Sequence, residues 1–135
     1  KANFGDPFFV AGIMLYEAEG TKVNNNFSNS DFRLMVVYIK FLEKYFKLDR
    51  KKDMNFRLYI HETRKIDLDR IKNFWGKKLN LDRDNFHISW KHNVVSQRRT
   101  NLDYVGQLNI RVRGISHFTG KILAISDIIL SVFQR

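Results

Sequence analysis

Two acidic residues close the first apolar segment of the chain. Glu17 and Glu19 follow the uncharged run 7–16, and Gly20 comes directly after them. Burying a carboxylate without a cation costs much free energy, so both acids are expected to emerge at the end of the segment. Acidic side chains there also face the negative end of a helix dipole, which is mildly unfavourable. This placement favours a metal-binding role, and a solvated helix end is the alternative.

The segment that carries these acids is predicted to be a helix over residues 7–19. Asp6 and Pro7 suit its N-cap and first turn, and Gly20 suits its end. A helix that is apolar on nearly every side is buried all round, either in a core or against a partner. Its small residues would allow another backbone to approach closely, and they are Ala11, Gly12 and Ala18.

Hydrophobic periodicity and capping residues predict the other elements. In order, they are a strand over 21–28, a helix from 29–31 to about 46, a strand over 54–61, a helix after Asp67, strands over 86–92 and 106–113, and a helix capped by Thr119. We expect an α+β fold with a mixed or antiparallel four-stranded sheet that has helices on one face. The last two strands are expected to form a hairpin-like pair.

The composition predicts one folded domain over residues 1–135. Hydrophobic residues make up 44% of the chain and there is one proline, which excludes a disordered tail. The absence of cysteine excludes a disulfide scaffold, a thiolate zinc site and a cysteine nucleophile. No stretch reaches the length of a membrane span, so a soluble protein is expected.

The chain is strongly basic, with 24 basic and 14 acidic residues and a formal net charge of +10. Residues 1–30 contain two basic and three acidic residues, so the whole excess lies in residues 31–135. Nucleic acid is the commonest polyanionic partner of a soluble basic domain. A solvated basic surface is the alternative.

Polar residues occupy the positions that are predicted to point away from the core. These positions are Lys22, Asn24, Asn26, Asn55, Arg57, Tyr59, His61, His87, Ser89, Lys91, Gln107, Asn109, Arg111 and Arg113, and none is acidic. Arg, Lys, Asn and Gln side chains hold phosphates and read guanine and adenine in the major groove. We therefore expect a strand-based DNA interface, with a solvated polar face as the alternative. Arg98 and Arg99 lie in the loop before the last strand, which is either a phosphate clamp or an exposed tip.

The stretch 14–20 resembles the LAGLIDADG motif of homing endonucleases, with Glu17, Ala18, Glu19 and Gly20 in place of Asp-Ala-Asp-Gly. The basic, strand-rich remainder is also similar in order, as in a divergent prokaryotic-style member. In that family, two such helices pack side by side and the last acid of each binds a divalent metal ion. The resemblance thus implies that Glu19 is the catalytic residue, that Glu19 and Gly20 form the metal site, and that Mg²⁺ is the cofactor.

The chain has one copy of the motif, which implies a homodimer on a pseudo-palindromic DNA site. The residues expected at the dimer interface are Ala11, Gly12, Leu15 and Ala18. The implied function is site-specific cleavage of double-stranded DNA inside a prokaryotic cell, in the cytoplasm or nucleoid. Because a fold does not determine an activity, two alternatives stay open: a non-catalytic DNA-binding regulator and an RNA-splicing maturase.

Overall fold

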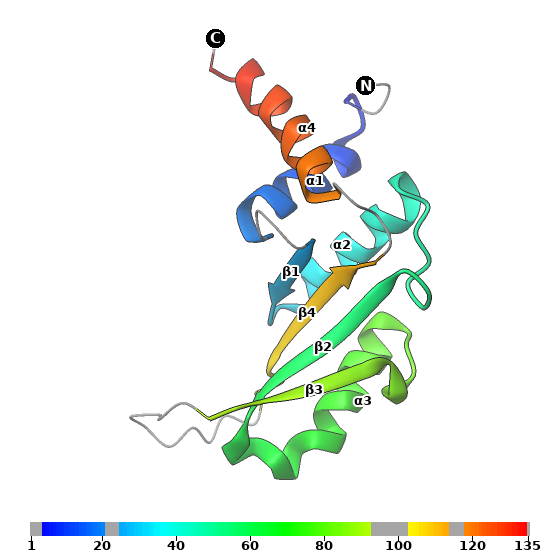
Figure 1. Cartoon of the computed structure of the whole chain (residues 1–135), viewed down its shortest axis with the longest axis vertical. Coiled ribbons are helices and arrows are strands. Elements are labelled where there is room, and N and C mark those ends of the chain that lie inside the picture. The colour runs from blue at the N-terminus through cyan, green and yellow to red at the C-terminus, as the bar shows by residue number, and fades with distance from the viewer. Residues whose placement is uncertain (1–3, 21–24, 93–102, 114–117, 135) are drawn as a thin grey trace.

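A computed structural model of the chain describes residues 4–20, 25–92, 103–113 and 118–134. Within these ranges the chain forms α-helices, short 3-10 helices and one sheet (Figure 1). The helices are α1 (Pro7–Glu19), α2 (Phe32–Tyr45), η1 (Glu62–Asp67), α3 (Leu68–Leu79), η2 (Arg83–Asn85) and α4 (Phe118–Val132). The strands are β1 (Asn26–Asn29), β2 (Met54–His61), β3 (Phe86–Lys91) and β4 (Gln107–Val112). The predicted α+β class and four-stranded mixed sheet are confirmed.

The first two α-helices begin at the predicted capping residues. The Asp6 carboxylate accepts the Phe8 N–H at 2.9 Å at the start of α1. Asp31 accepts the Arg33 N–H at 2.9 Å at the start of α2. Each bond satisfies an N–H that has no partner inside its helix, which is why the helices begin where the sequence indicates.

The predicted cap of the last helix is wrong. Thr119 lies inside the first turn of α4 instead of before it. Its N–H donates to Oδ1 of Asn25 at 3.0 Å, so a side chain that is distant in sequence provides the acceptor. Of the strand predicted over 21–28, residues 21–24 lie outside the described residues. The described strand β1 begins after Asn25, which has a left-handed backbone (φ 56°), and ends at Asn29.

The expected hairpin of the last two strands is wrong as well. The strand order is β1-β4-β2-β3, so β4 lies between β1 and β2 and is antiparallel to both, while β3 is parallel to β2 at the edge. Burial agrees with this order. Leu108 and Ile110 of the central strand β4 are fully buried, whereas Ile88 and Trp90 of the edge strand β3 are only half-buried.

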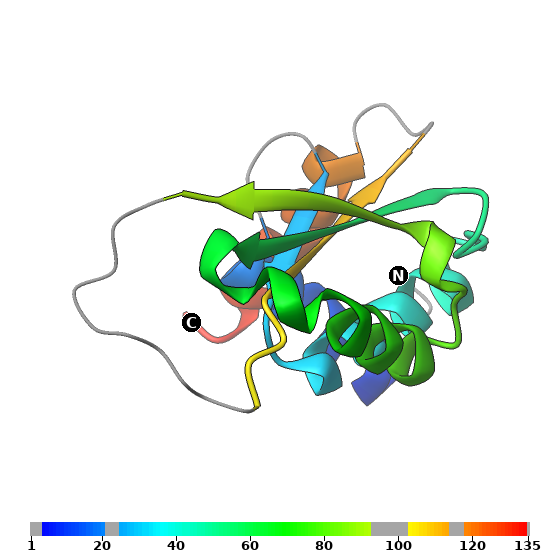
Figure 2. The same ribbon diagram turned by 90° about the horizontal axis from the view of Figure 1, so that it is seen from below.

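The core lies between one face of the sheet and the helices α2 and α3, which are on the same side of it (Figure 2). The Tyr38 ring of α2 stacks on Phe27 of β1 with ring centroids 4.1 Å apart. Trp75 of α3 is fully buried and its Nε1–H donates to the Val105 carbonyl at 2.8 Å. The opposite face of the sheet therefore carries the polar residues of the strands.

Helices α1 and α4 pack against each other at one end of the molecule (Figure 1). The buried Ser126 hydroxyl of α4 donates to the Glu17 carboxylate of α1 at 2.6 Å. Helix α1 also packs against α2, where Gly12 lies beneath the Phe41 ring. In the described part of the chain, no helix has the length and apolar character needed to span a bilayer.

Candidate nucleic-acid interface

The outward residues of the four strands form one surface, which we call the polar face. Its members are Asn26, Ser28, Asn55, Arg57, Tyr59, His61, His87, Ser89, Lys91, Gln107, Asn109 and Arg111. None of them is acidic. The structure thus brings together the strand positions that were predicted to point outward and that it describes. Ser28, which the sequence analysis had not included, joins them because it lies two residues after Asn26 and side chains alternate along a strand.

The strand register arranges the polar face in rows that cross the sheet. The rows are Asn26–Arg111–Asn55, then Ser28–Asn109–Arg57–His87, then Gln107–Tyr59–Ser89, and last His61–Lys91. Neighbouring strands lie about 4.8 Å apart, so members of a row are within reach of one another. Long polar side chains therefore stand side by side over the width of the sheet.

Hydrogen bonds hold several of these side chains in place. Asn109 accepts a bond from the Ser28 hydroxyl at 2.6 Å and donates to Asn26 Oδ1 at 3.0 Å. The Arg57 guanidinium donates to the Ser89 hydroxyl at 2.8 Å. Because these side chains are already ordered, less conformational entropy is lost when they contact a ligand.

Arg111 differs from the other arginine of the polar face. It is exposed and, among the described residues, makes no hydrogen bond or ion pair, whereas Arg57 is bonded to Ser89. Arg111 lies in one row between Asn26 and Asn55. A free guanidinium between two amides can contact a phosphate or the O6 and N7 atoms of guanine.

Arg113, which was also predicted to point outward, is exposed beyond the last residue of β4. Its guanidinium donates to the Lys52 carbonyl in the turn before β2. The exposed side chains of Lys51 and Lys52 belong to this turn and extend the positive surface beyond the first row. These two lysines were not among the predicted residues, although a basic turn directly before a predicted strand was a usable signal. Lys22, Asn24, Arg98 and Arg99 lie outside the described residues.

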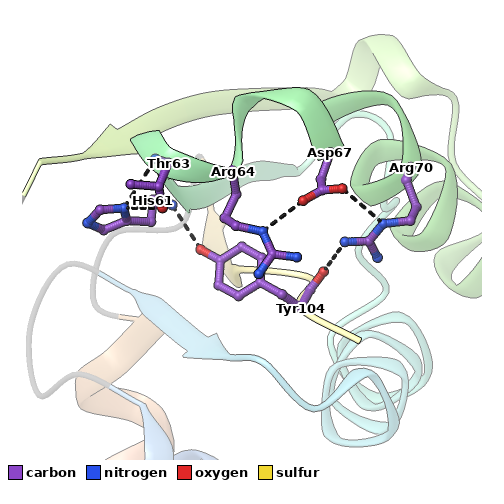
Figure 3. A network of polar contacts seen from close by, with 6 residues as sticks. All are labelled: His61, Thr63, Arg64, Asp67, Arg70 and Tyr104. Carbon is purple, nitrogen blue, oxygen red and sulfur yellow. Dashed lines mark hydrogen bonds and ion pairs between the residues drawn. The ribbon is translucent and has the colours of Figure 1, made fainter. Parts of the chain in front are cut away.

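The other end of the polar face is held by a network around Tyr104 (Figure 3). Its hydroxyl accepts the His61 N–H at 2.8 Å, and its carbonyl accepts a bond from Arg70 at 2.7 Å. The buried Arg64 guanidinium lies 4.7 Å from the Tyr104 ring centroid and donates to Asp67 at 2.7 Å. The hydrogen bond from Arg64 lowers the pKa of the Asp67 carboxyl.

This network contributes to the register of β4. It fixes the chain just before β4, so that Gln107 pairs with Tyr59. A slip of one residue would turn Leu108 and Ile110 toward solvent and their polar neighbours into the core. The contacts around Tyr104 therefore help to keep the polar side chains of β4 on the outer face.

Glu19 lies at the edge of the sheet next to β1. Gly20, the next residue, forms an isolated antiparallel bridge with Phe27 of β1. A Cβ on Gly20 would be 2.6 Å from the Tyr16 ring, so only glycine fits at this position. Glu19 is exposed, whereas Glu17 is half-buried and accepts a bond from Ser126. The two acids thus have different surroundings.

The carboxylate of Glu19 is a hard oxygen ligand and its chemistry suits Mg²⁺. In residues 4–20, 25–92, 103–113 and 118–134, however, no group of three or more His, Cys, Asp or Glu side chains is arranged to hold a metal ion. A Mg²⁺ site at Glu19 would therefore need further ligands, from a second chain or from DNA phosphates.

The residues predicted at a dimer interface do not share one environment. Ala11 and Ala18 are exposed and Leu15 is half-buried, so they are accessible on α1. Gly12 is buried, and a Cβ on it would overlap the Phe41 ring of the same chain. The close approach that Gly12 permits is therefore used within the chain, and Gly12 does not offer a surface to a second subunit.

Comparison of the chain with protein-family models, with curated proteins and with solved structures finds no match in any of the three. The case for a function consequently depends on the chemistry of the polar face, the position of Glu19 and the motif resemblance.

Proposed function

We propose that the polar face binds double-stranded DNA in the major groove. The observation that carries this proposal is the continuous, acid-free surface of Arg, Lys, Asn, Gln and His side chains over four strands. An ordinary solvated sheet face mixes acidic and basic residues, because opposite charges across strands are stabilising. A surface without acids attracts phosphates and offers the donors and acceptors that base edges require.

The second part of the proposal is that two copies of the chain act as a site-specific endonuclease with a LAGLIDADG-like fold. The position of Glu19 supports it, because this exposed carboxylate lies at the β1 edge, where a second chain could bring its own Glu19. Bound Mg²⁺ would supply a Lewis acid that activates water and neutralises charge on the leaving oxygen. The chain itself would provide Glu19 as a ligand and the polar face to orient the duplex.

A non-catalytic DNA-binding regulator is the second candidate. The observation that favours it is that the described part of one chain offers no complete metal site. The regulator would use the same polar face, so DNA binding alone does not distinguish the two candidates. A splicing maturase would instead prefer structured RNA to duplex DNA.

The test begins with selection of bound duplexes from a random pool. The selected duplex is then incubated with the protein, with and without Mg²⁺. We expect strand cleavage only with Mg²⁺, and we expect Glu19→Gln to keep its DNA affinity but lose cleavage. Asp127→Asn is the matched control, because Asp127 is an exposed acid on α4 that makes no ion pair among the described residues.

Each outcome has a distinct meaning. Binding without cleavage by the native chain supports the regulator, and preference for structured RNA supports the maturase. Full cleavage by Glu19→Gln would remove Glu19 from the metal site. A chain that stays monomeric on the selected duplex would contradict the two-copy site. Failure to enrich any duplex would contradict DNA binding itself.

A further inference from the structure

The hydroxyl of Thr119 joins three parts of the chain at the end of α1. Thr119 is buried in the first turn of α4. Its Oγ1 donates to Asn25 Oδ1 at 2.6 Å and accepts the Asn25 N–H at 3.0 Å. The Tyr16 hydroxyl lies 3.0 Å from the same oxygen. Three hydrogen bonds therefore meet at one buried oxygen.

The donor in the hydrogen bond between Tyr16 and Thr119 follows from the number of hydrogens on the Thr119 hydroxyl. A threonine hydroxyl has one hydrogen and two lone pairs. The hydrogen of Thr119 goes to the Asn25 side chain, so the hydroxyl can only accept from Tyr16. Tyr16 is consequently the donor, and the hydrogen-bonding capacity of the Thr119 hydroxyl is completely used.

The Tyr16 ring in turn determines where the end of α1 lies. Tyr16 is fully buried, stacked on Phe27 at 6.3 Å and edge-on to Phe118 at 6.1 Å. Its ring is in contact with Gly20, where a Cβ would be only 2.6 Å away. The Gly20 N–H also donates to the Tyr16 carbonyl at 2.7 Å. Rotation of the ring would therefore displace the peptide that links Glu19 to Gly20.

Asn25 connects the same hydroxyl to the polar face. Its carbonyl accepts the Val112 N–H at 3.2 Å, at the end of β4, and Asn26 directly follows it in the first row of the polar face. The left-handed backbone of Asn25 allows its N–H and its side chain to bond to Thr119 together.

We propose that Thr119 is a positioning residue: its hydroxyl holds the Tyr16 ring, and through that ring the Glu19–Gly20 peptide, at a constant position relative to the polar face. The role of Glu19 in cleavage rests on the proposed function, whereas the effect on the peptide does not. Displacement of a reacting group by about 1 Å costs up to about 100-fold in rate. A single hydroxyl far from Glu19 in sequence would therefore control the rate of the chemical step.

The experiment compares Thr119→Val with Thr119→Ser. Valine keeps the shape of threonine and lacks the hydroxyl, while serine keeps the hydroxyl. We expect Thr119→Val to retain DNA affinity, to lower kcat by roughly 10- to 100-fold and to require more Mg²⁺ for half-maximal cleavage. Thr119→Ser should keep the native DNA affinity and restore the other two values. Amide hydrogen exchange at Gly20 should be faster in Thr119→Val than in Thr119→Ser.

Two further variants keep the test decisive. Tyr16→Phe removes only the donor hydroxyl and should reproduce the effects of Thr119→Val, which covers the case in which the valine variant does not fold. Ser126→Ala is the matched control, because it removes another buried hydroxyl that links α4 to α1, through its bond to Glu17. We expect it to leave Gly20 exchange unchanged.

The outcomes for the two proposals are separable. If the native chain does not cleave DNA, the nuclease proposal fails, and Gly20 exchange still tests the positioning role. The inference would be overturned if Thr119→Val kept both the native kcat and the native rate of Gly20 exchange. If the valine variant does not fold, the same result in Tyr16→Phe would overturn it. Equal loss in the serine and valine variants would also overturn it, because the hydroxyl would then not be the cause.

Discussion

The ring of Phe41 lies directly over Gly12, and a Cβ on that residue would overlap with it. The two residues belong to α2 and α1 of the same chain. A small residue in an apolar helix thus serves the packing of two helices within one subunit. Of the four residues expected at a dimer interface, Ala11, Leu15 and Ala18 remain accessible to a second copy.

This contact predicts a large difference between two glycine substitutions. Gly12→Ala should lower the free energy of unfolding by about 1–3 kcal/mol, because the methyl group would force the Phe41 ring to move. Gly120→Ala in α4 is the control. It has nothing within 4 Å of a Cβ and should be neutral or more stable by up to about 1 kcal/mol. Urea denaturation measures both, and equal effects would contradict the packing described.

Substitution of Tyr38 should have an unusual effect on stability for a core residue. Its hydroxyl is buried and has no hydrogen-bond partner in the part of the chain that the structure describes. Burial raises the pKa of Tyr38 well above its ordinary value, as expected for a hydroxyl that cannot ionise without solvent. Tyr38→Phe should therefore be neutral or stabilising by about 1 kcal/mol. Denaturant midpoints would show this, and a loss of stability would mean that the hydroxyl is bonded.

Substitution of Arg111 tests the polar face without a DNA-cleavage assay. Arg111→Ala should weaken DNA binding by about 1–3 kcal/mol and reduce its dependence on salt, because a free guanidinium on the interface is lost. Arg33→Ala is the matched control. Arg33 is exposed on α2 and paired with Asp31 at 2.7 Å, outside the polar face. Fluorescence anisotropy at several salt concentrations measures both variants. An unchanged salt slope in Arg111→Ala would remove the polar face from the DNA-binding proposal.

Substitution of Asp67 should change how the stability of the fold depends on acid pH. The Arg64 hydrogen bond lowers the pKa of Asp67, so this ion pair stabilises the folded chain above the unfolded pKa of an aspartate. That stability is lost as the pH falls through the lower, folded pKa. Asp67→Asn should therefore be less stable than the native chain at neutral pH, and the difference should shrink toward acid pH. Denaturant midpoints between neutral and acid pH test it, with Asp84→Asn as the exposed control. A difference that does not depend on pH would contradict the role of this ion pair.

Local patterns predicted the elements that depend on local forces. The strict alternation at 54–61 corresponds to β2, and the acids at positions 6 and 31 cap α1 and α2. Both signals lie within a few residues of the element that they define. The outward positions of the strands followed from the same alternation, which is why most of the polar face could be anticipated.

Contacts between distant residues could not be anticipated in this way. The interval between the last two strands suggested a hairpin, but β4 pairs with β1 and β2, and Leu108 and Ile110 are completely buried there. Thr119 looked like a helix cap, whereas its hydroxyl bonds to Tyr16 and Asn25. Neither partner is near Thr119 in the sequence.

By itself, the sequence determined the α+β class, the excess of basic residues in 31–135 and the emergence of Glu19 at the end of an apolar helix. Charge, composition and periodicity are properties of the chain alone. Only the tertiary structure decided that Gly12 belongs to the core, that Arg113 turns toward Lys52 and that Arg111 lies between two asparagines in one row. These outcomes depend on which strands become neighbours. That choice is made by the burial of apolar side chains over the whole molecule, and no short segment contains it.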